Sequence, residues 1–147
     1  MPRRGACGTR RREAQVALHG RCLCEGVKFE VDEAPTMMGT CHCTRCQRQT
    51  GSAASTAIVI DPGKFSVTQG EELIKEYAEE GFTSRYFCGN CGSFLYGRGE
   101  NMMYAAAGAL ADDPGVRPQF HMFVGSKAPW DEIHDELPQF PEYPEIS

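Results

Sequence analysis

The arrangement of the cysteines is the strongest constraint on this chain. Seven of its eight cysteines fall into three short clusters, namely Cys22 and Cys24 as CxC, Cys41, Cys43 and Cys46 as CxCxxC, and Cys88 and Cys91 as CxxC. Such spacings are typical of metal sites in intracellular proteins, where thiols stay reduced. The eighth cysteine, Cys7, has no other cysteine nearby, and we assign it no role.

Seven ligands divide naturally into four and three. A structural zinc takes four protein ligands, whereas a catalytic zinc takes three and keeps one position open. The CxxC knuckle supplies half of a closed site, because Gly89 and Gly92 allow the backbone to fold around a metal. If Cys22 and Cys24 lie on an extended segment, both sulfurs point to one face and supply the other half. The CxCxxC cluster can converge on a metal alone and is the candidate for the open site.

Two alternatives stay open at this point. Disulfides would need an oxidising compartment, and cysteines two apart on a strand are poorly placed to bridge one another. Alternatively, both sites are structural, with a fourth ligand for CxCxxC from His42 or elsewhere. In an extended segment His42 points away from its flanking cysteines, which makes it an awkward ligand.

The number of thiolates indicates the chemistry of an open site. Three thiolates on one zinc give a net charge of about −1, so the metal is a weak Lewis acid and activation of water is disfavoured. A soft site of this kind suits another sulfur, and a substrate thiol bound there can lose its proton and remain nucleophilic. We therefore expect addition of a thiol to an aldehyde carbonyl, or the reverse.

Length and charge narrow the class of partner. The 147 residues are typical of a single domain. The chain has 15 basic and 20 acidic residues; five arginines and only one acid lie in the first 13 positions, which leaves 10 basic and 19 acidic residues in 14–147. An acidic body repels nucleic-acid backbones. No apolar run predicts a membrane span or signal peptide, so we expect a cytoplasmic protein with a basic, disordered tail at 1–18 and one domain at 19–147.

Alternating and β-branched segments predict a mainly β fold. The predicted strands are 27–31, 56–60, 64–68, 84–88 and 93–97, and 102–110 is short and apolar enough for a buried strand. Segment 71–80 fits either a helix or a strand. Pro129 and the acids that follow it predict a short C-terminal helix over 129–137.

Five stretches together resemble one family: HGRCLCEGVKFEV, CHCTRCQRQTGS, SRYFCGNCGSFLY, GALADDPGVRPQFHMFVGSKAPW and DELPQF. They are similar to the glutathione-dependent formaldehyde-activating enzymes, a family that includes centromere protein V. The resemblance covers about 19–140. It implies stacked antiparallel sheets, a strand at 71–80, and two zinc ions per chain. The structural zinc would be held by Cys22, Cys24, Cys88 and Cys91, and the catalytic zinc by Cys41, Cys43 and Cys46.

The implied activity is that of a carbon–sulfur lyase, which reversibly joins glutathione and formaldehyde into S-(hydroxymethyl)glutathione. Glutathione carries two carboxylates, so a site for it should offer cations, and Arg45, Arg48 and Lys127 are candidates that are equally ordinary as surface charges. His121 fits either an acid–base role or a structural hydrogen bond. Trp130 fits either a cleft wall or simple packing.

A second function remains open. Both zinc ions could be structural, and the arginine-rich tail could contact nucleic acid or an acidic partner; the acidic body opposes this reading. A redox function lacks a candidate thiol, because Cys7 is the only cysteine outside the clusters.

Overall fold

The computed structural model describes residues 17–145, which form two β-sheets. The smaller sheet has the order β1–β2–β5, with bounds β1 Leu18–Arg21, β2 Lys28–Val31 and β5 Phe65–Gln69. The larger has the order β10–β3–β4–β9–β8–β7–β6, with bounds β3 Met38–Cys41, β4 Ser55–Ile60, β6 Ile74–Tyr77, β7 Ser84–Cys88, β8 Phe94–Arg98, β9 Met103–Ala106 and β10 His121–Met122. Neighbouring strands are antiparallel except β10, which runs parallel to β3. The mainly β prediction is confirmed.

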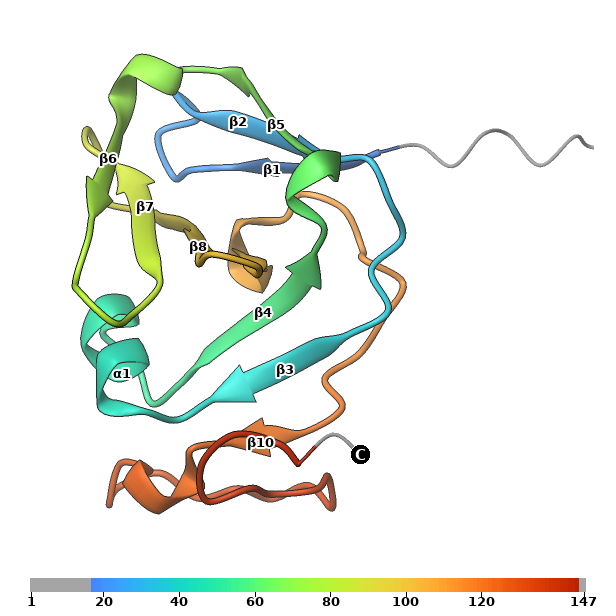
Figure 1. Ribbon diagram of the computed structural model, residues 1–147, viewed down its shortest axis with the longest axis vertical. Helices are drawn as coiled ribbons and strands as arrows, with labels where there is room; N and C mark the ends of the chain where they lie inside the picture. Colours follow the sequence, from blue (N-terminus) through green and yellow to red (C-terminus); the bar gives the residue numbers. More distant parts are fainter. Residues whose placement is uncertain (1–16, 146–147) are drawn as a thin grey trace, which may run out of the picture.

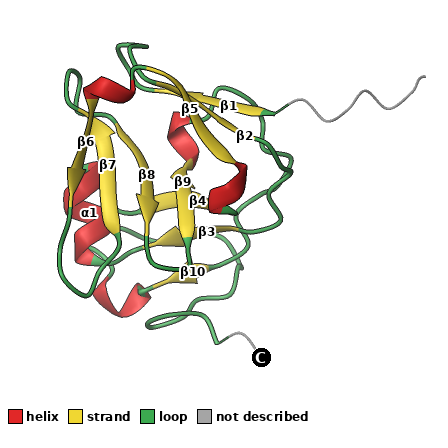
Figure 2. Cartoon of the chain, turned by 45° about the horizontal axis from the view of Figure 1, so that its top comes forward, coloured by secondary structure: helices red, strands yellow, loops and turns green. Residues whose placement is uncertain are grey.

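The two sheets enclose the core. In Figure 1 the small sheet lies at the top, and the large sheet curves from β3 and β10 at the bottom to β6 and β7 at the left; Figure 2 shows the same curvature through β8 and β9. Phe29, Ile58, Leu95 and Met103 are fully buried between them, and each such side chain contributes about 1.5–3 kcal/mol. The Phe65 ring joins the layers, with its centroid 5.3 Å from that of Phe29 and 4.6 Å from that of Tyr96.

The predicted strands are all present, with small shifts at their ends. Segment 71–80, which pattern alone left open, forms a 3-10 turn at Glu71–Leu73 followed by β6, so the strand implied by the resemblance is confirmed. The apolar segment 102–110 forms β9 and then a 3-10 turn at Ala107–Ala109. Between β4 and β5 the chain forms a 3-10 turn, Pro62–Lys64, capped by the side chain of Asp61.

The C-terminal helix predicted over 129–137 is wrong. This segment is turn and irregular structure, and the only α-helix within residues 17–145 is α1, Thr44–Thr50; a 3-10 turn, Val124–Ser126, precedes the segment. Its groups are committed to tertiary partners instead. Asp135 faces His121, and the backbone N–H of His121 donates to the Pro138 carbonyl. These contacts replace the local hydrogen bonds on which the helix prediction relied.

Leu18, which we expected in the tail, is buried in β1 and pairs with Val31. Residues 1–16 of the predicted tail, including Cys7 and all five of its arginines, lie outside the described residues. No helix in the described part is both long and apolar enough to cross a membrane.

Candidate metal centres and the adjoining pocket

The structure brings the CxCxxC sulfurs together at the end of β3. Cys41 is the last residue of β3, Cys43 is the N-cap of α1, and Cys46 lies in its first turn. The three Sγ atoms all lie within 4.8 Å of one another, and within residues 17–145 no His, Cys, Asp or Glu atom joins them as a fourth member. Cys41 and Cys46 are buried, whereas Cys43 is partly exposed. The group could hold one metal ion with an open side at Cys43.

Local hydrogen bonds prepare Cys43 to be a thiolate. Its Sγ accepts from the backbone N–H of Cys46 at 3.3 Å, which is the usual role of a capping side chain. Hydrogen bonds from Cys41 and Cys46, followed by those from the backbone of Cys46 and Arg45, lower the pKa of Cys43 strongly. The pKa of Cys41 is raised by its hydrogen bonds to the same neighbours and by burial. Because a metal binds thiolates, it would displace the protons that this cluster shares.

Two buried histidines lie behind the cluster. Nε2 of His42 lies 2.8 Å from Nδ1 of His121, and Nε2 of His121 lies 2.9 Å from the Asp135 carboxylate. His42 is therefore not a member of the sulfur cluster, as its alternation with the cysteines predicts. Burial, then the charge of His121, lowers the pKa of His42. Of the two alternatives for His121, the structure shows the hydrogen bonds of the structural role.

The parallel strand β10 fixes the backbone on which these cysteines sit. His121 pairs with Thr40 and Met122 with Cys41, and the backbone N–H of His42 donates to the Met122 carbonyl at 2.9 Å. The side chain of Gln47 on α1 donates to the carbonyls of His42 and Ser126. The chain from Cys41 to Cys43 is thus held on both sides.

The other four clustered cysteines meet at the end of β7, where Cys88 is the last residue of the strand. Cys22, Cys24, Cys88 and Cys91 have all their Sγ atoms within 4.8 Å of one another. The Cys22–Cys24 distance is 3.5 Å and the Cys24–Cys88 distance is 3.8 Å. Gly92, at φ 78°, lets the knuckle turn back so that its N–H donates to the Cys88 carbonyl. Four sulfurs in this arrangement could hold a second metal ion in a closed site.

One detail of this group differs from the sequence expectation. Residues 22–25 form a tight turn rather than an extended segment, with Glu25 at φ 60° and its N–H donating to the Cys22 carbonyl. Burial raises the pKa of Cys22 to about 11, and the N–H of Val27, which donates to its sulfur at 3.2 Å, opposes that rise. The two sulfurs converge because the backbone turns around them, not because they alternate along a strand.

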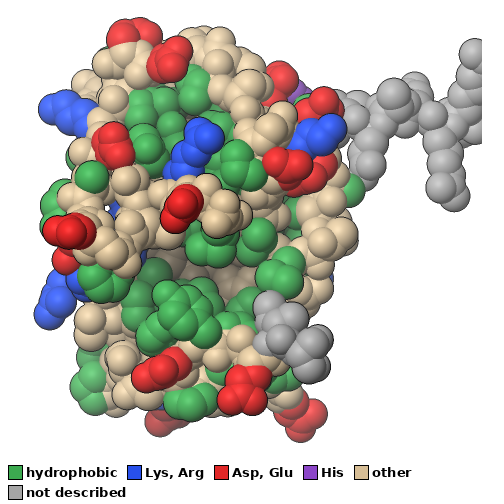
Figure 3. Space-filling view, in the orientation of Figure 1, with side chains coloured by type: hydrophobic (Ala, Val, Ile, Leu, Met, Phe, Trp, Pro, Cys, Tyr) green, Lys and Arg blue, Asp and Glu red, His purple; other side chains and the backbone are tan. Residues whose placement is uncertain are grey.

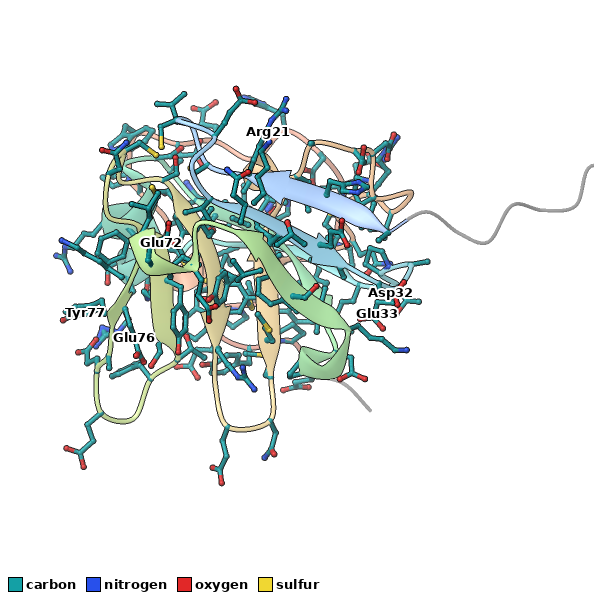
Figure 4. All side chains as sticks on the ribbon, turned by 90° about the horizontal axis from the view of Figure 1, so that it is seen from above. Arg21, Asp32, Glu33, Glu72, Glu76 and Tyr77 are labelled. Atoms are coloured by element: carbon teal, nitrogen blue, oxygen red, sulfur yellow. The ribbon has the colours of Figure 1, made fainter. Side chains whose placement is uncertain are left out.

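A pocket of about 590 Å³ lies between α1 and the strands β6 to β8. Its lining includes three arginines, one glutamate and two phenylalanines: Arg45, Arg48, Arg85, Glu79, Phe87 and Phe94. In Figure 3 acidic side chains are scattered over the visible face, and some basic ones project at the left edge, at the height of α1 in Figure 1. Tyr77, on the pocket lining, points outward at the end of β6 in Figure 4.

Arg85 is a pocket residue that the sequence did not single out. The pKa of Cys46 is lowered by its hydrogen bond to Cys41 and raised more by Cys43 and burial, and the positive charge of Arg85 opposes the rise. Burial raises the pKa of Tyr104, and the negative charge of Cys46 raises it further. The positive charge of Arg85 lowers the pKa of Tyr104. Arg85 lines the pocket from β7, opposite the lining residues of α1.

Of the cations predicted to contact a substrate carboxylate, two lie in the pocket and one does not. Arg45 and Arg48 are part of the pocket lining. Lys127 is not: its ammonium donates to the backbone carbonyls of Ala128 and Asp131. Trp130 is 70% exposed and lines neither of the two main pockets in the described part of the chain.

The comparison with protein families decides the relationship. The family described as glutathione-dependent formaldehyde-activating enzyme matches residues 17–126. The chain belongs to this family. A curated Talaromyces marneffei protein named for the same family is 30% identical over 116 residues, covering 71% of this chain and 60% of that protein. Its Podospora anserina counterpart is 26% identical over 114 residues, covering 72% and 54%.

The matches cover only part of the length of the curated relatives. The chain spans between 54% and 61% of the length of the curated relatives it matches. A solved crystal structure of a Rhodobacter sphaeroides protein aligns with a TM-score of 0.55 at 22% identity, covering 68% of this chain and 91% of that one. That likeness supports the fold of the family member described here.

Proposed function

We propose that this domain is a zinc-dependent carbon–sulfur lyase that reversibly adds glutathione to formaldehyde. The observation that carries the proposal is the three-sulfur cluster, which lies beside a cationic pocket and within the described residues has no fourth protein ligand. Membership of the family supports glutathione and formaldehyde as the reactants.

The donor sets fit zinc. Cys22, Cys24, Cys88 and Cys91 offer four sulfurs, the number that a closed structural zinc takes. Cys41, Cys43 and Cys46 offer three, the number found in catalytic sites with an open position. Backbone N–H groups donate to Cys22 and Cys43, and such hydrogen bonds help a sulfur to carry the negative charge that a metal ligand needs.

When bound by three thiolates, zinc would supply a soft open position that favours the thiolate form of an incoming thiol. The overall reaction forms a bond between the substrate sulfur and the aldehyde carbon, while the carbonyl π pair moves to oxygen, which takes up the proton released by the thiol. The chain holds the reactants in place for this step. Cys41 and Cys46 are buried, and Phe87 and Phe94 give the pocket apolar walls.

Metal content and exchange kinetics test the proposal together. The purified protein should contain two zinc ions, and NMR exchange spectroscopy with ¹³C-formaldehyde should show faster interconversion of free and glutathione-bound formaldehyde. C43S should lose one zinc ion and the acceleration, while C7S, which changes the cysteine outside the clusters, should keep both. A C43S protein that accelerates the exchange as the parent does would refute the assignment.

A further inference from the structure

We propose that Arg85, together with Arg45, binds a carboxylate of the thiol substrate in the pocket beside Cys46. This inference rests on the proposed function, because it assigns a role in substrate binding to residues next to the candidate catalytic cluster. It adds a specificity element: the thiols accepted would be those that carry an anionic group.

The pocket contains polar atoms that lack partners. Buried side-chain nitrogen and oxygen atoms without a hydrogen bond occur at four places in residues 17–145, and three of them belong to residues that line this pocket: Nε of Arg45, Oε1 of Gln49 and Nη1 of Arg85. The fourth is on His42. Two of the three pocket atoms, on Arg45 and Arg85, are donors, and a buried donor left without an acceptor is costly, so an acceptor bound in the pocket would satisfy both.

The charges of the pocket call for an anion. The side chain of Arg45, on α1, contacts the loop between β6 and β7. Its Nη2 lies 2.6 Å from Oε1 of Glu79, and its guanidinium carbon lies 3.5 Å from the centre of the Phe82 ring. No ion pair to an acid is found for Arg85 among the described residues. The lining therefore has an excess of positive charge. Guanidinium groups bind carboxylates with two parallel hydrogen bonds, which makes this the matching ligand.

The fold places Arg85 in a row of paired residues that crosses the large sheet. Arg85 on β7 pairs with Gly97 on β8, and Gly97 pairs with Tyr104 on β9, so the three lie in one row across the sheet. A Cβ atom at Gly97 would lie 2.2 Å from Cζ of Tyr104, so the ring lies directly over the glycine. The pocket adjoins the cluster through helix α1, which carries Cys46 together with the lining residues Arg45 and Gln49.

The size of the pocket suits a substrate larger than a simple thiol. About 590 Å³ lies in the range of small-molecule sites. In this proposal a thiol held at the cluster would extend along α1, past Gln49, toward Arg85. Phe87 and Phe94 would then contact the apolar parts of the chain between sulfur and carboxylate.

Another role for Arg85 must be distinguished. Three thiolates on a divalent metal have a net negative charge of about −1, and Arg85 could simply neutralise it. In that case its removal would weaken metal binding and would affect all thiols equally. A carboxylate site would instead affect only thiols that carry the anion.

The test compares ligands that differ only in charge. Calorimetric titration of the zinc-loaded protein should show that glutathione binds more tightly than its diethyl ester, in which both carboxylates are neutral. In R85Q the affinity for glutathione should fall about ten- to a hundredfold, as expected for loss of a charged hydrogen bond, and the advantage over the ester should disappear. R85K should recover part of it, and R117Q, at an exposed arginine paired with Asp113, should bind as the parent does.

S-methylglutathione separates this inference from the proposed function. Its sulfur carries no ionisable proton, so its binding does not depend on formation of a thiolate. R85Q should therefore weaken its binding even if the protein proves inactive with formaldehyde. Zinc content, measured on each variant, should remain two per chain in R85Q. Equal affinity of R85Q and the parent for S-methylglutathione and glutathione would overturn the inference, and so would loss of one zinc ion from R85Q.

Discussion

Nε2 of His42 lies 2.8 Å from Nδ1 of His121, although the two residues are 79 positions apart. The Asp135 carboxylate accepts a hydrogen bond from Nε2 of His121, so the other ring nitrogen, Nδ1, is the one that faces His42. One exposed carboxylate thus orients the buried pair. It ties the peptide between Cys41 and Cys43 to the C-terminal segment.

Loss of the His121 ring should loosen the three-cysteine site. H121F removes the hydrogen-bond partner of His42 and leaves a buried ring nitrogen unpaired, which should cost about 1–3 kcal/mol of unfolding free energy. Chelator competition should also show weaker binding of one of the two zinc ions. H134A, at a histidine 83% exposed, is the control and should change neither quantity. Unchanged metal affinity in H121F would mean that the histidine pair serves the fold alone.

The two cysteine groups should respond differently to removal of a ligand. C88S takes a buried ligand from the closed site, where metal binding supplies folding free energy, so we expect loss of cooperative thermal unfolding. C43S removes a partly exposed ligand beside the pocket and should leave a cooperative transition in circular dichroism. If both variants unfold alike, the division into structural and catalytic sites is wrong.

The two sites should also differ in how readily they lose their metal. A chelator of moderate affinity should take the zinc of the three-cysteine group first, because three ligands and an open position hold it less firmly than four. Loss of activity should then precede loss of the folded state, as followed by metal analysis, exchange NMR and circular dichroism on the same samples. The reverse order would contradict the assignment of the two sites.

Gly97 should be sensitive to the smallest substitution. In G97A the new Cβ would overlap the Tyr104 ring, which would have to move, and overpacking of this kind costs about 1–3 kcal/mol. The row from Arg85 to Tyr104 would move with it, so glutathione affinity should fall as well. G108A is the matched control, since nothing lies within 4 Å of a Cβ there. Equal stability of G97A and G108A in urea would show that the ring adapts without cost.

Several features could be read from the sequence because they are local. The alternation of 56–60 and 84–88 predicted β4 and β7, and the division of the cysteines into four and three matches the two sulfur groups. Knuckle spacing works as a signal because residues two or three apart cannot move far from one another. The helix predicted over 129–137 failed for the opposite reason, since partners distant in sequence took its hydrogen-bonding groups.

Arg85, which the sequence analysis did not single out, and His121, whose role it left open, depend on distant partners. An arginine at 85 in a strand is ordinary, and it becomes notable only because α1 closes the pocket over it without supplying an acid. His121 had no visible partner until β10 paired in parallel with β3 and brought it against His42. No spacing rule connects such residues.

The amino-acid sequence by itself determined which thiols cluster and that short strands would build the fold. Only the tertiary structure decided what surrounds those thiols: a buried histidine pair on one side and an arginine without an acid on the other. The physical reason is that ligand spacing within a turn depends on a few backbone angles, whereas burial and charge pairing depend on which strands become neighbours.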